Sequence, residues 1–438
     1  MMKKIGFYIA LASKLWSLNL SNTATLAELD PLHLPFNIQV HMNEKGDAAA
    51  VWANMTNASE GALESATKPF DSSWLSASTI TTGNIGLCSI QSVMDKEGNI
   101  GVLWKTSCSS QSHYFSEKKW MHPWSKAEQI SFNYNGYKFE KVVMDKDRNL
   151  LAISEVPWSK TSAVVLAFYD AKVQKTTYEE KGKGDVFSSS IDLWIDNRGV
   201  ALAVWEKSHY KGGWFGSTDE SGLEGAWHED HQPWSMPEML VYRKKDETVH
   251  HGVQIAIDAE KNATVIRTIG SGETRQLQAL SFIKGKWLAP VDVASVSGRI
   301  TDLNLSMDEK GNCLLIWHDN SKGIFQSAYK ALGQEWSAVM EVTHNINVRF
   351  PRLAFDYRGN FVLVWGEGVE DTGCIAGAVF SAQTKSWTMP SRLTPENEMG
   401  FEANLAFSEA GKGVLVWSYA INVKNPQFNI HAAEIVLE

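Results

Sequence analysis

One ten-residue motif, repeated about every 50 residues, constrains the fold of this chain more than any other feature. In its clearest copy, Asp308 to Trp317, a turn of the form Asp-x-x-Gly precedes an apolar run that ends in tryptophan. The first turn position recurs at Asn43, Asp95, Asp145, Asp196, Asp258, Asp308, Asp356 and Ser408, at intervals of 52, 50, 51, 62, 50, 48 and 52 residues. A near-constant period of this length leaves room for four short strands per repeat, which predicts a β-propeller with one blade per repeat.

The chemistry of the turn predicts a β-hairpin. Asp at the first position accepts hydrogen bonds from the amides of the turn, and Gly at the fourth supplies a positive φ. Tryptophan follows nine residues after the turn position in six repeats, as Trp52, Trp104, Trp205, Trp317, Trp365 and Trp417. Because large aromatic side chains dominate cores, we expect them to pack between blades and not to form a platform for sugars or cations. Ser154 and Arg267 interrupt the series, and we expect gaps there.

The two ends of the chain complement each other. The eighth repeat ends after its third strand, Asn429 to Val436, and Thr23 to Asp30 has the spacing of a fourth strand, 20 residues before the turn at Asn43. An N-terminal strand that completes the last blade would close the ring and remove both sheet edges. The sequence therefore predicts an all-β protein, a single propeller of eight four-stranded blades over residues 23–438, with seven blades as the alternative.

The N-terminal 22 residues resemble a secretory signal peptide. Two lysines, Lys3 and Lys4, precede an apolar run from Ile5 to Ala12. A frayed helix is the alternative interpretation. The net charge of −9 argues against nucleic acid or an anionic membrane surface as a partner, and no stretch of 18 apolar residues predicts a membrane-spanning helix. We expect an exported monomer, periplasmic or extracellular.

Four cysteines are present. Counted outward from the turn at Asp95, Cys88 and Cys108 come near each other across a hairpin, so we expect them to form a disulfide. Cys313 and Cys374 lie at opposite ends of their strands and are expected to stay unpaired as small buried apolar residues.

The Asp-x-x-Gly-Asn hairpin with its following tryptophan resembles the blades of bacterial secreted β-propellers, over Thr23 to Glu438. It is similar to the turn of NHL-type repeats but lacks their second aspartate. It also lacks the Ser-x-Asp-x-Gly-x-Thr-Trp box of sialidases and the Ala-x-Asp-x-x-Thr-Gly pattern of quinone-dependent dehydrogenases. The resemblance therefore implies a fold, and it implies no catalytic residue and no cofactor.

Four residues before each turn, the innermost strand carries a polar side chain. These residues are Gln39, Gln91, Lys141, Asp192, Gln254, Asn304, Arg352 and Asn404. Because side chains alternate along a strand and the residues one and three before the turn are mostly apolar, we expect the polar ones to ring the axial channel. Water in the channel would by itself explain a polar ring. The charged members, Lys141, Asp192 and Arg352, are the better candidates for ligand binding, because amides would serve for wetting alone.

The loops divide between two faces. The tight turns and the third-to-fourth strand loops share one face, and the second-to-third strand loops share the other with the connections between blades. Tight turns leave little room for recognition, so the second face is the expected ligand face.

The fourth repeat contains an acidic segment, Asp219 to Pro233, with five acidic residues and two histidines but no lysine or arginine. Its spacing matches no metal-binding motif, so a solvated acidic loop is favoured over a calcium or transition-metal site. We assign no metal ligand.

Two classes of function remain. The first is a non-enzymatic binding scaffold that holds a glycan, a peptide or a partner protein at the channel mouth. The second is a hydrolase or lyase that acts on glycans on the same face. Asp192 is the only acid in the polar ring, and glycoside hydrolysis usually needs two carboxylates, which favours binding.

Overall fold

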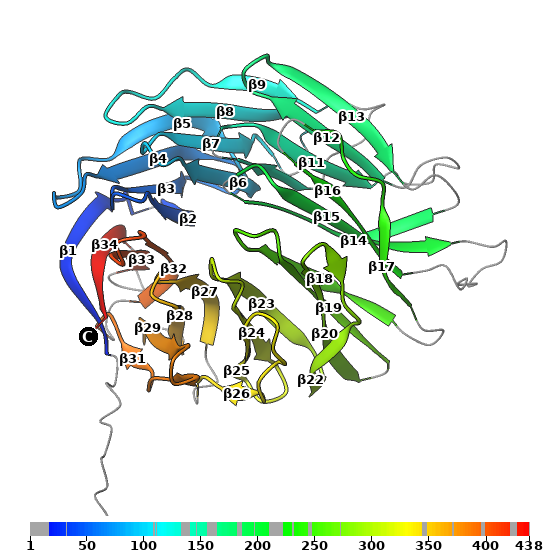
Figure 1. Ribbon diagram of the computed structural model, residues 1–438. Helices are drawn as coiled ribbons and strands as arrows, with labels where there is room; N and C mark the ends of the chain where they lie inside the picture. Colours follow the sequence, from blue (N-terminus) through cyan, green and yellow to red (C-terminus); the bar gives the residue numbers. More distant parts are fainter. Residues whose placement is uncertain are drawn as a thin grey trace, which may run out of the picture.

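The fold is an eight-bladed β-propeller. The computed structural model describes residues 17–31, 33–107, 110, 112–132, 141–145, 147–155, 164–181, 186–196, 198–209, 222–229, 232–243, 248–271, 273–343, 348–369, 372–395, 399–420 and 427–437. Within them, strands β1 to β34 form eight sheets and no helix occurs. The sheets stand around a central axis, and the colours of Figure 1 follow the chain once around the ring. The prediction of eight blades is confirmed, and the alternative of seven is wrong.

The first four blades run in sequence order, each from its innermost to its outermost strand. They comprise β2 (Leu34–Met42), β3 (Ala48–Met55), β4 (Glu60–Lys68) and β5 (Ser78–Asn84); β6 (Gly86–Met94), β7 (Ile100–Lys105), β8 (Ser112–Lys118) and β9 (Glu128–Ser131); β10 (Lys141–Met144), β11 (Leu150–Glu155), β12 (Val164–Asp170) and β13 (Lys175–Lys181); and β14 (Val186–Ile195), β15 (Ala201–His209), β16 (Gly222–His228) and β17 (Glu238–Tyr242).

The fifth to seventh blades follow the same order, but in two of them the outermost strand is split into two short pieces. They comprise β18 (Thr248–Ile257), β19 (Ala263–Ser271), β20 (Thr274–Ile283), β21 (Lys286–Trp287) and β22 (Val291–Ser297); β23 (Ile300–Met307), β24 (Cys313–Asp319), β25 (Ile324–Lys330) and β26 (Met340–Glu341); and β27 (Val348–Phe355), β28 (Asn360–Val369), β29 (Thr372–Ser381), β30 (Ser386–Trp387) and β31 (Ser391–Arg392).

The eighth blade joins the two ends of the chain. Its strands β32 (Met399–Phe407), β33 (Gly413–Ala420) and β34 (Phe428–Leu437) are followed by β1 (Leu18–Glu28), which pairs antiparallel with β34 from Leu18↔Leu437 to Glu28↔Asn429. In Figure 1 the blue β1 lies along the red β34. The predicted closure is confirmed, and the strand starts at Leu18, five residues earlier than Thr23. Each innermost strand contacts the next one around the ring, and β32 contacts β2.

The asparagine of the Asp-x-x-Gly-Asn motif ties two turns of a blade together. In five blades its backbone N–H donates to one oxygen of the turn aspartate at 2.7–2.9 Å, and its side-chain amide donates to the other oxygen. In four of these its own amide oxygen accepts a backbone N–H from the third-to-fourth strand turn, at 2.8–3.2 Å. These asparagines are Asn99, Asn149, Asn262, Asn312 and, without the second link, Asn360. The motif is therefore a device that locks both hairpins of one blade.

The hairpin tryptophans form the contacts between blades. All six are at most 2 % exposed. Each packs in a cluster with apolar residues of the preceding blade, as Trp52 does with Val416 and Ile430, and Trp317 with Ile266 and Leu277. They are core residues, as the sequence predicted, and none can serve as a binding platform.

Arg267 takes the tryptophan position in the fifth blade without leaving a gap. It is 1 % exposed, its Nε and Nη2 donate to Gln278 at 2.9 and 2.7 Å, and it pairs with the equally buried Glu206 of the fourth blade. The expected opening at this position is wrong, because a hydrogen-bonded guanidinium fills the volume and has its charge compensated.

Candidate functional site

The eight polar residues of the predicted ring lie on the innermost strands of the eight blades. Seven are partly buried, and Asp192 is buried. In six blades the strand pairing shifts register immediately before the ring position, as between Phe36 and Gln39, and in the eighth blade the shift ends one residue earlier, at Ala403. A β-bulge of this kind re-aims the next side chain. Three bulge residues, Asn37, Asp302 and Phe350, have φ values of 54°, 50° and 52°.

Several ring side chains bind the neighbouring blade. The amide of Gln39 donates to the carbonyl oxygen of Ile90 at 2.8 Å and accepts the N–H of Ser92 at 2.7 Å. It therefore pairs with β6 as a residue of an adjacent strand would. Gln91 donates to the carbonyl of Val142 in the third blade.

The closure of the ring uses the same contact. The amide of Asn404 in the eighth blade donates to the carbonyl oxygen of Ile38 in the first, at 3.1 Å. The amides of Gln254 and Asn304 instead reach carbonyl groups of their own strands, those of Val253 at 3.1 Å and Asp302 at 3.4 Å. The ring is thus a partial belt of contacts between blades and not only a wetted wall.

The charged ring members form ion pairs across blade junctions. Lys141 of the third blade pairs with Asp192 of the fourth, whose carboxylate also accepts the N–H of Leu193 at 2.9 Å. Burial lowers the pKa of Lys141 to about 8, although the carboxylate of Asp192 favours the charged ammonium. The pair brings together two of the three charges that the sequence singled out.

Arg352 pairs with a residue that the sequence analysis missed. Its Nη2 lies 3.4 Å from Oε1 of Glu402 in the eighth blade, and Oε2 of Glu402 accepts the N–H of Asn37 in the first blade at 2.9 Å. Burial raises the pKa of the Glu402 carboxyl, against the opposing effect of Arg352. Glu402 lies six residues before its turn, an even offset, so the alternation that placed the ring could also have placed this carboxylate in the channel.

The turn end of the channel opens into a cavity of about 480 Å³. Seven of the eight turns contribute to its wall. In six of them the residue that follows the first turn position lies on it: Glu44, Lys96, Ala259, Glu309, Tyr357 and Glu409. The fourth blade contributes Arg198, two residues after Asp196. Burial, together with the charges of Glu309, Glu409 and Glu44, raises the pKa of Tyr357 to about 12. Burial and the same glutamates also raise the pKa of Glu409. Three acids thus share one side of the mouth.

Apolar side chains complete this cavity. The wall includes Trp194, two residues before its turn, and a set of residues one before their turns: Met42, Met94, Ile195, Ile257, Met307 and Phe355. The apolar residues one before each turn, which the alternation assigned to the space between blades, therefore also reach the mouth. The tight turns leave more room than expected.

The opposite face, where the sequence placed the ligand, lies mostly outside the described residues. This holds for residues 156–163, 210–221 and 421–426 among the second-to-third strand loops. The placement of a ligand on that face stays a prediction.

Part of the acidic segment is a strand and not a loop. Gly222–His228 form β16, with all seven residues buried. Glu224 accepts the indole N–H of Trp205 at 3.1 Å and pairs with Lys207, and Glu229 pairs with Lys261. The expectation of a solvated acidic loop is therefore wrong for Glu224, whose carboxylate is buried and paired in β16, whereas Glu229 follows the strand and is exposed. Asp219, Glu220, Asp230 and His231 lie outside the described residues. The described part of the chain holds no cluster of three or more His, Cys, Asp or Glu residues able to bind a metal ion.

The structure tests the predictions for two of the four cysteines. Cys313 and Cys374 are buried and form no disulfide, as expected, and burial raises the pKa of Cys313 to about 12. Cys108 lies outside the described residues, as does the side chain of Cys88. Their disulfide stays a prediction, which mass spectrometry of the non-reduced protein would test.

Comparison with solved structures supports the propeller class. The chain is similar to the BP39L lectin from Burkholderia pseudomallei, with a TM-score of 0.52 and 10% sequence identity over 82% of this chain and 99% of the lectin. It is also similar to a PL25 ulvan lyase, with a TM-score of 0.47 and 10% identity over 77% of this chain and 90% of that one. A protein of unknown function from Dyadobacter fermentans gives a TM-score of 0.41 and 8% identity over 96% and 99% of the two chains. At these identities the likeness is one of fold.

No protein family profile and no curated protein sequence matches the chain. Among the described residues, no helix is long and apolar enough to cross a membrane.

Proposed function

We propose that this propeller is an exported, non-enzymatic binding scaffold that holds a glycan, a peptide or a partner protein at a mouth of its axial channel. The observation that carries the proposal is the cavity of about 480 Å³ at the turn end, which seven blades line. Its wall combines aromatic, thioether and charged side chains, the mixture that binding pockets use for affinity and orientation. The ring charges Lys141, Asp192 and Arg352 lie along the channel behind it.

A ligand screen with site variants tests this proposal. A glycan array and a peptide array are probed with the parent protein and with the double variant Trp194→Ala, Tyr357→Ala, both of which remove cavity wall. The control is Tyr242→Ala, an exposed tyrosine on β17 outside the cavity. A ligand retained by the control and lost by the double variant supports the proposal. Equal binding by all three proteins contradicts it.

Export rests on residues 1–22 alone, of which Leu18 to Asn22 form the start of β1, so that a removable signal ends before Leu18. We infer that this segment directs secretion, because a basic end precedes an apolar run. Expression of the full chain in a bacterial host, followed by fractionation and N-terminal sequencing, checks this. A protein that stays in the cytoplasm with its first residues intact would contradict it.

One observation favours a second candidate, a hydrolase or lyase that acts on glycans. Glu402 is a carboxyl with a raised pKa beside Arg352 on the channel wall, which is an environment suited to a general acid. A hydrolysis and lyase screen on polysaccharides, run beside the arrays, tests it. Turnover by the parent protein that Glu402→Gln abolishes would replace the binding proposal with an enzymatic one.

A further inference from the structure

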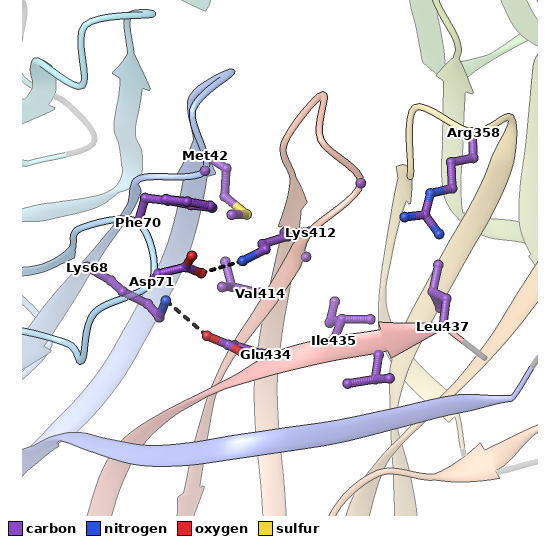
Figure 2. A pocket seen from close by; sticks show the side chains of 14 residues that line it. Met42, Lys68, Phe70, Asp71, Arg358, Lys412, Val414, Glu434, Ile435 and Leu437 are labelled. Atoms are coloured by element: carbon purple, nitrogen blue, oxygen red, sulfur yellow. Dashed lines mark hydrogen bonds and ion pairs between the residues drawn. The ribbon is translucent and has the colours of Figure 1, made fainter.

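A second cavity lies at the turn end where the ring closes. It measures about 220 Å³ and is lined by residues of the first, seventh and eighth blades. Figure 2 shows its apolar floor, with Val414, Ile435 and Leu437, and Phe70 on one wall. Three cationic side chains, Lys68, Arg358 and Lys412, also line it.

The cavity exists because the eighth blade lacks a feature that other blades have. In the first, second and sixth blades, the third-to-fourth strand turn places a side chain over the glycine of the tight turn. Phe70, Trp120 and Leu332 lie 2.8, 2.9 and 3.0 Å from the Cβ positions of Gly46, Gly98 and Gly311. In the eighth blade β34 pairs with β1, which comes from the other end of the chain, so no such turn covers Gly411.

Two cationic side chains lie near Gly411, where other blades have the side chain of the third-to-fourth strand turn. Nε of Arg358, from the turn of the seventh blade, lies 2.7 Å from the Cβ position of Gly411, where the other blades have a turn side chain. At the motif position where five blades carry asparagine, the eighth carries Lys412. Both departures from the repeat thus bring positive charge to the same cavity.

The acids of the cavity are already paired. Lys412 pairs with Asp71, and Lys68 lies 3.0 Å from Glu434 (Figure 2). Although burial of Glu434 acts in the opposite direction, its hydrogen bonds to Lys68 and Asn22 hold its pKa below the usual value. With two acids against three cations, the cavity keeps a net positive charge.

Of the three cations that line the cavity, Arg358 is the one without an acidic partner among the described residues. Its side chain points into the cavity in Figure 2, and the described residues offer its guanidinium no hydrogen-bond acceptor. Arg198 provides the comparison, because it holds the same turn position in the fourth blade. Its guanidinium donates to Asp196 at 2.8 Å and to the carbonyl of Asp258, in the next blade, at 2.9 Å. The guanidinium N–H groups that bind acceptors in Arg198 therefore have no acceptor among the described residues in Arg358.

We propose that this cavity binds the carboxylate of a small acidic ring compound, such as one sugar-acid unit. A guanidinium presents paired donors that match a planar carboxylate, and Lys412 can add a second charge from its exposed pair with Asp71. Phe70, 43 % exposed, adds an aromatic ring beside the charges, with the ammonium of Lys412 4.3 Å from the ring centroid. The volume is below the roughly 300–1,000 Å³ of pockets for whole drug-sized ligands, so a single ring or a terminal unit fits. This site is separate from the channel mouth and does not rest on the proposed function.

Binding of sodium glucuronate, measured by saturation-transfer NMR and calorimetry, tests the proposal. Glucose lacks the carboxylate, acetate lacks the ring and sulfate is not planar. We expect glucuronate to bind most strongly, acetate to compete weakly and glucose to give no signal. Arg358→Gln should weaken glucuronate binding about 10- to 150-fold, the effect of losing a charge-assisted hydrogen bond. Phe70→Ala should weaken glucuronate binding but leave competition by acetate unchanged.

The control is Arg299→Gln, which removes an exposed arginine that lines neither cavity and should leave glucuronate binding unchanged. Thermal melting checks that Arg358→Gln is folded, and little change is expected because the guanidinium has no partner in the described residues. Preference for sulfate over glucuronate would replace the planar carboxylate with a tetrahedral anion and overturn the proposal. So would no binding by the parent protein, or equal binding by the parent and Arg358→Gln.

Discussion

At the scale of single residues, the tryptophans of the repeat differ in what their indole N–H groups do. In the first blade Nε1 of Trp52 donates to Glu64 at 2.9 Å, whereas Nε1 of Trp365 in the seventh blade is buried with no partner among the described residues. Both side chains are at most 1 % exposed. The repeat therefore supplies a matched pair of positions in which burial is equal and hydrogen bonding is not.

We predict that Trp52→Phe is the more destabilising of two equivalent substitutions. Trp52→Phe and Trp365→Phe remove similar volume, but only the first takes a donor from a carboxylate. The difference should be about 1–3 kcal/mol in the free energy of unfolding, measured by chemical denaturation. Equal losses would mean that the bond to Glu64 contributes nothing to stability.

His41 makes the stability depend on pH. It contacts the hydroxyl of Ser92 in the next blade at 2.7 Å, and burial lowers its pKa to about 4 from 6.5. Between these values the unfolded chain binds a proton that the folded protein does not. The contribution of His41 to the free energy of unfolding is therefore fully present above about pH 6.5. It is lost as the pH drops toward 4, and the loss from this residue is at most about 3 kcal/mol.

The variant His41→Gln tests this, because glutamine can still bond Ser92 but does not titrate. The unfolding free energy of the parent minus that of the variant should fall by up to about 3 kcal/mol as the pH drops from 6.5 to 4, whatever its value at neutral pH. Parallel curves over this range would contradict the assignment. Burial also lowers the pKa of His431, so the variant keeps part of the acid sensitivity.

At the scale of elements, β1 holds the ring closed from both sides of the eighth blade. Leu18, 3 % exposed, packs with Val364 and Ile375 of the seventh blade. Leu26, 8 % exposed, packs with Ile38 and Val40 of the first. The strand thus covers the open edge of β34 and also fills two junctions between blades.

Removing β1 should therefore destabilise the whole ring. Deletion of residues 1–30 is expected to lower the melting temperature, and a synthetic peptide of residues 17–30 should restore it by pairing with β34. Because a deletion can simply fail to fold, Leu18→Ala and Leu26→Ala provide a second measurement, with expected losses of about 2–4 kcal/mol each. A deletion variant as heat-stable as the parent would refute the role of β1.

Elements were predictable here because each is specified by a local signal that repeats. The turn at Asp308 fixes a hairpin, its period fixes a blade, and the missing fourth strand beside Asn429 indicates closure. Contacts that join different blades have no such signal. Arg267 contacts Gln278 and Glu206, and Glu224 of β16 contacts Trp205, between side chains about 11 to 61 residues apart in the sequence. Such contacts can be predicted only when the register of several strands is known.

At the scale of the whole molecule, the polar ring has two roles that one experiment can separate. The sequence analysis placed its residues on the channel and considered only water and ligand as their partners. The structure shows that Lys141–Asp192 and Arg352–Glu402 span junctions between blades. Removing their charges should therefore affect stability as well as binding.

We predict both effects for the triple variant Lys141→Gln, Asp192→Gln, Arg352→Gln. Loss of one desolvated, charge-assisted hydrogen bond should weaken a channel ligand about 10- to 150-fold. The control is Lys126→Gln, Glu238→Gln, Arg299→Gln, which removes the same number of charges of each sign from exposed positions. Unchanged affinity in the ring variant, for a ligand found by the arrays, would place the binding site outside the channel.

Stability separates the two roles further. Arg352→Gln alone leaves Glu402 without its cation in a site that already raises its pKa, and should cost about 1–3 kcal/mol. Adding Glu402→Gln removes the uncompensated carboxylate and should recover much of that loss, because replacing both partners of an ion pair costs less than removing one. If the double variant regains stability but not affinity, Arg352 binds the ligand as well as the neighbouring blade. If it regains both, the ring serves the propeller alone.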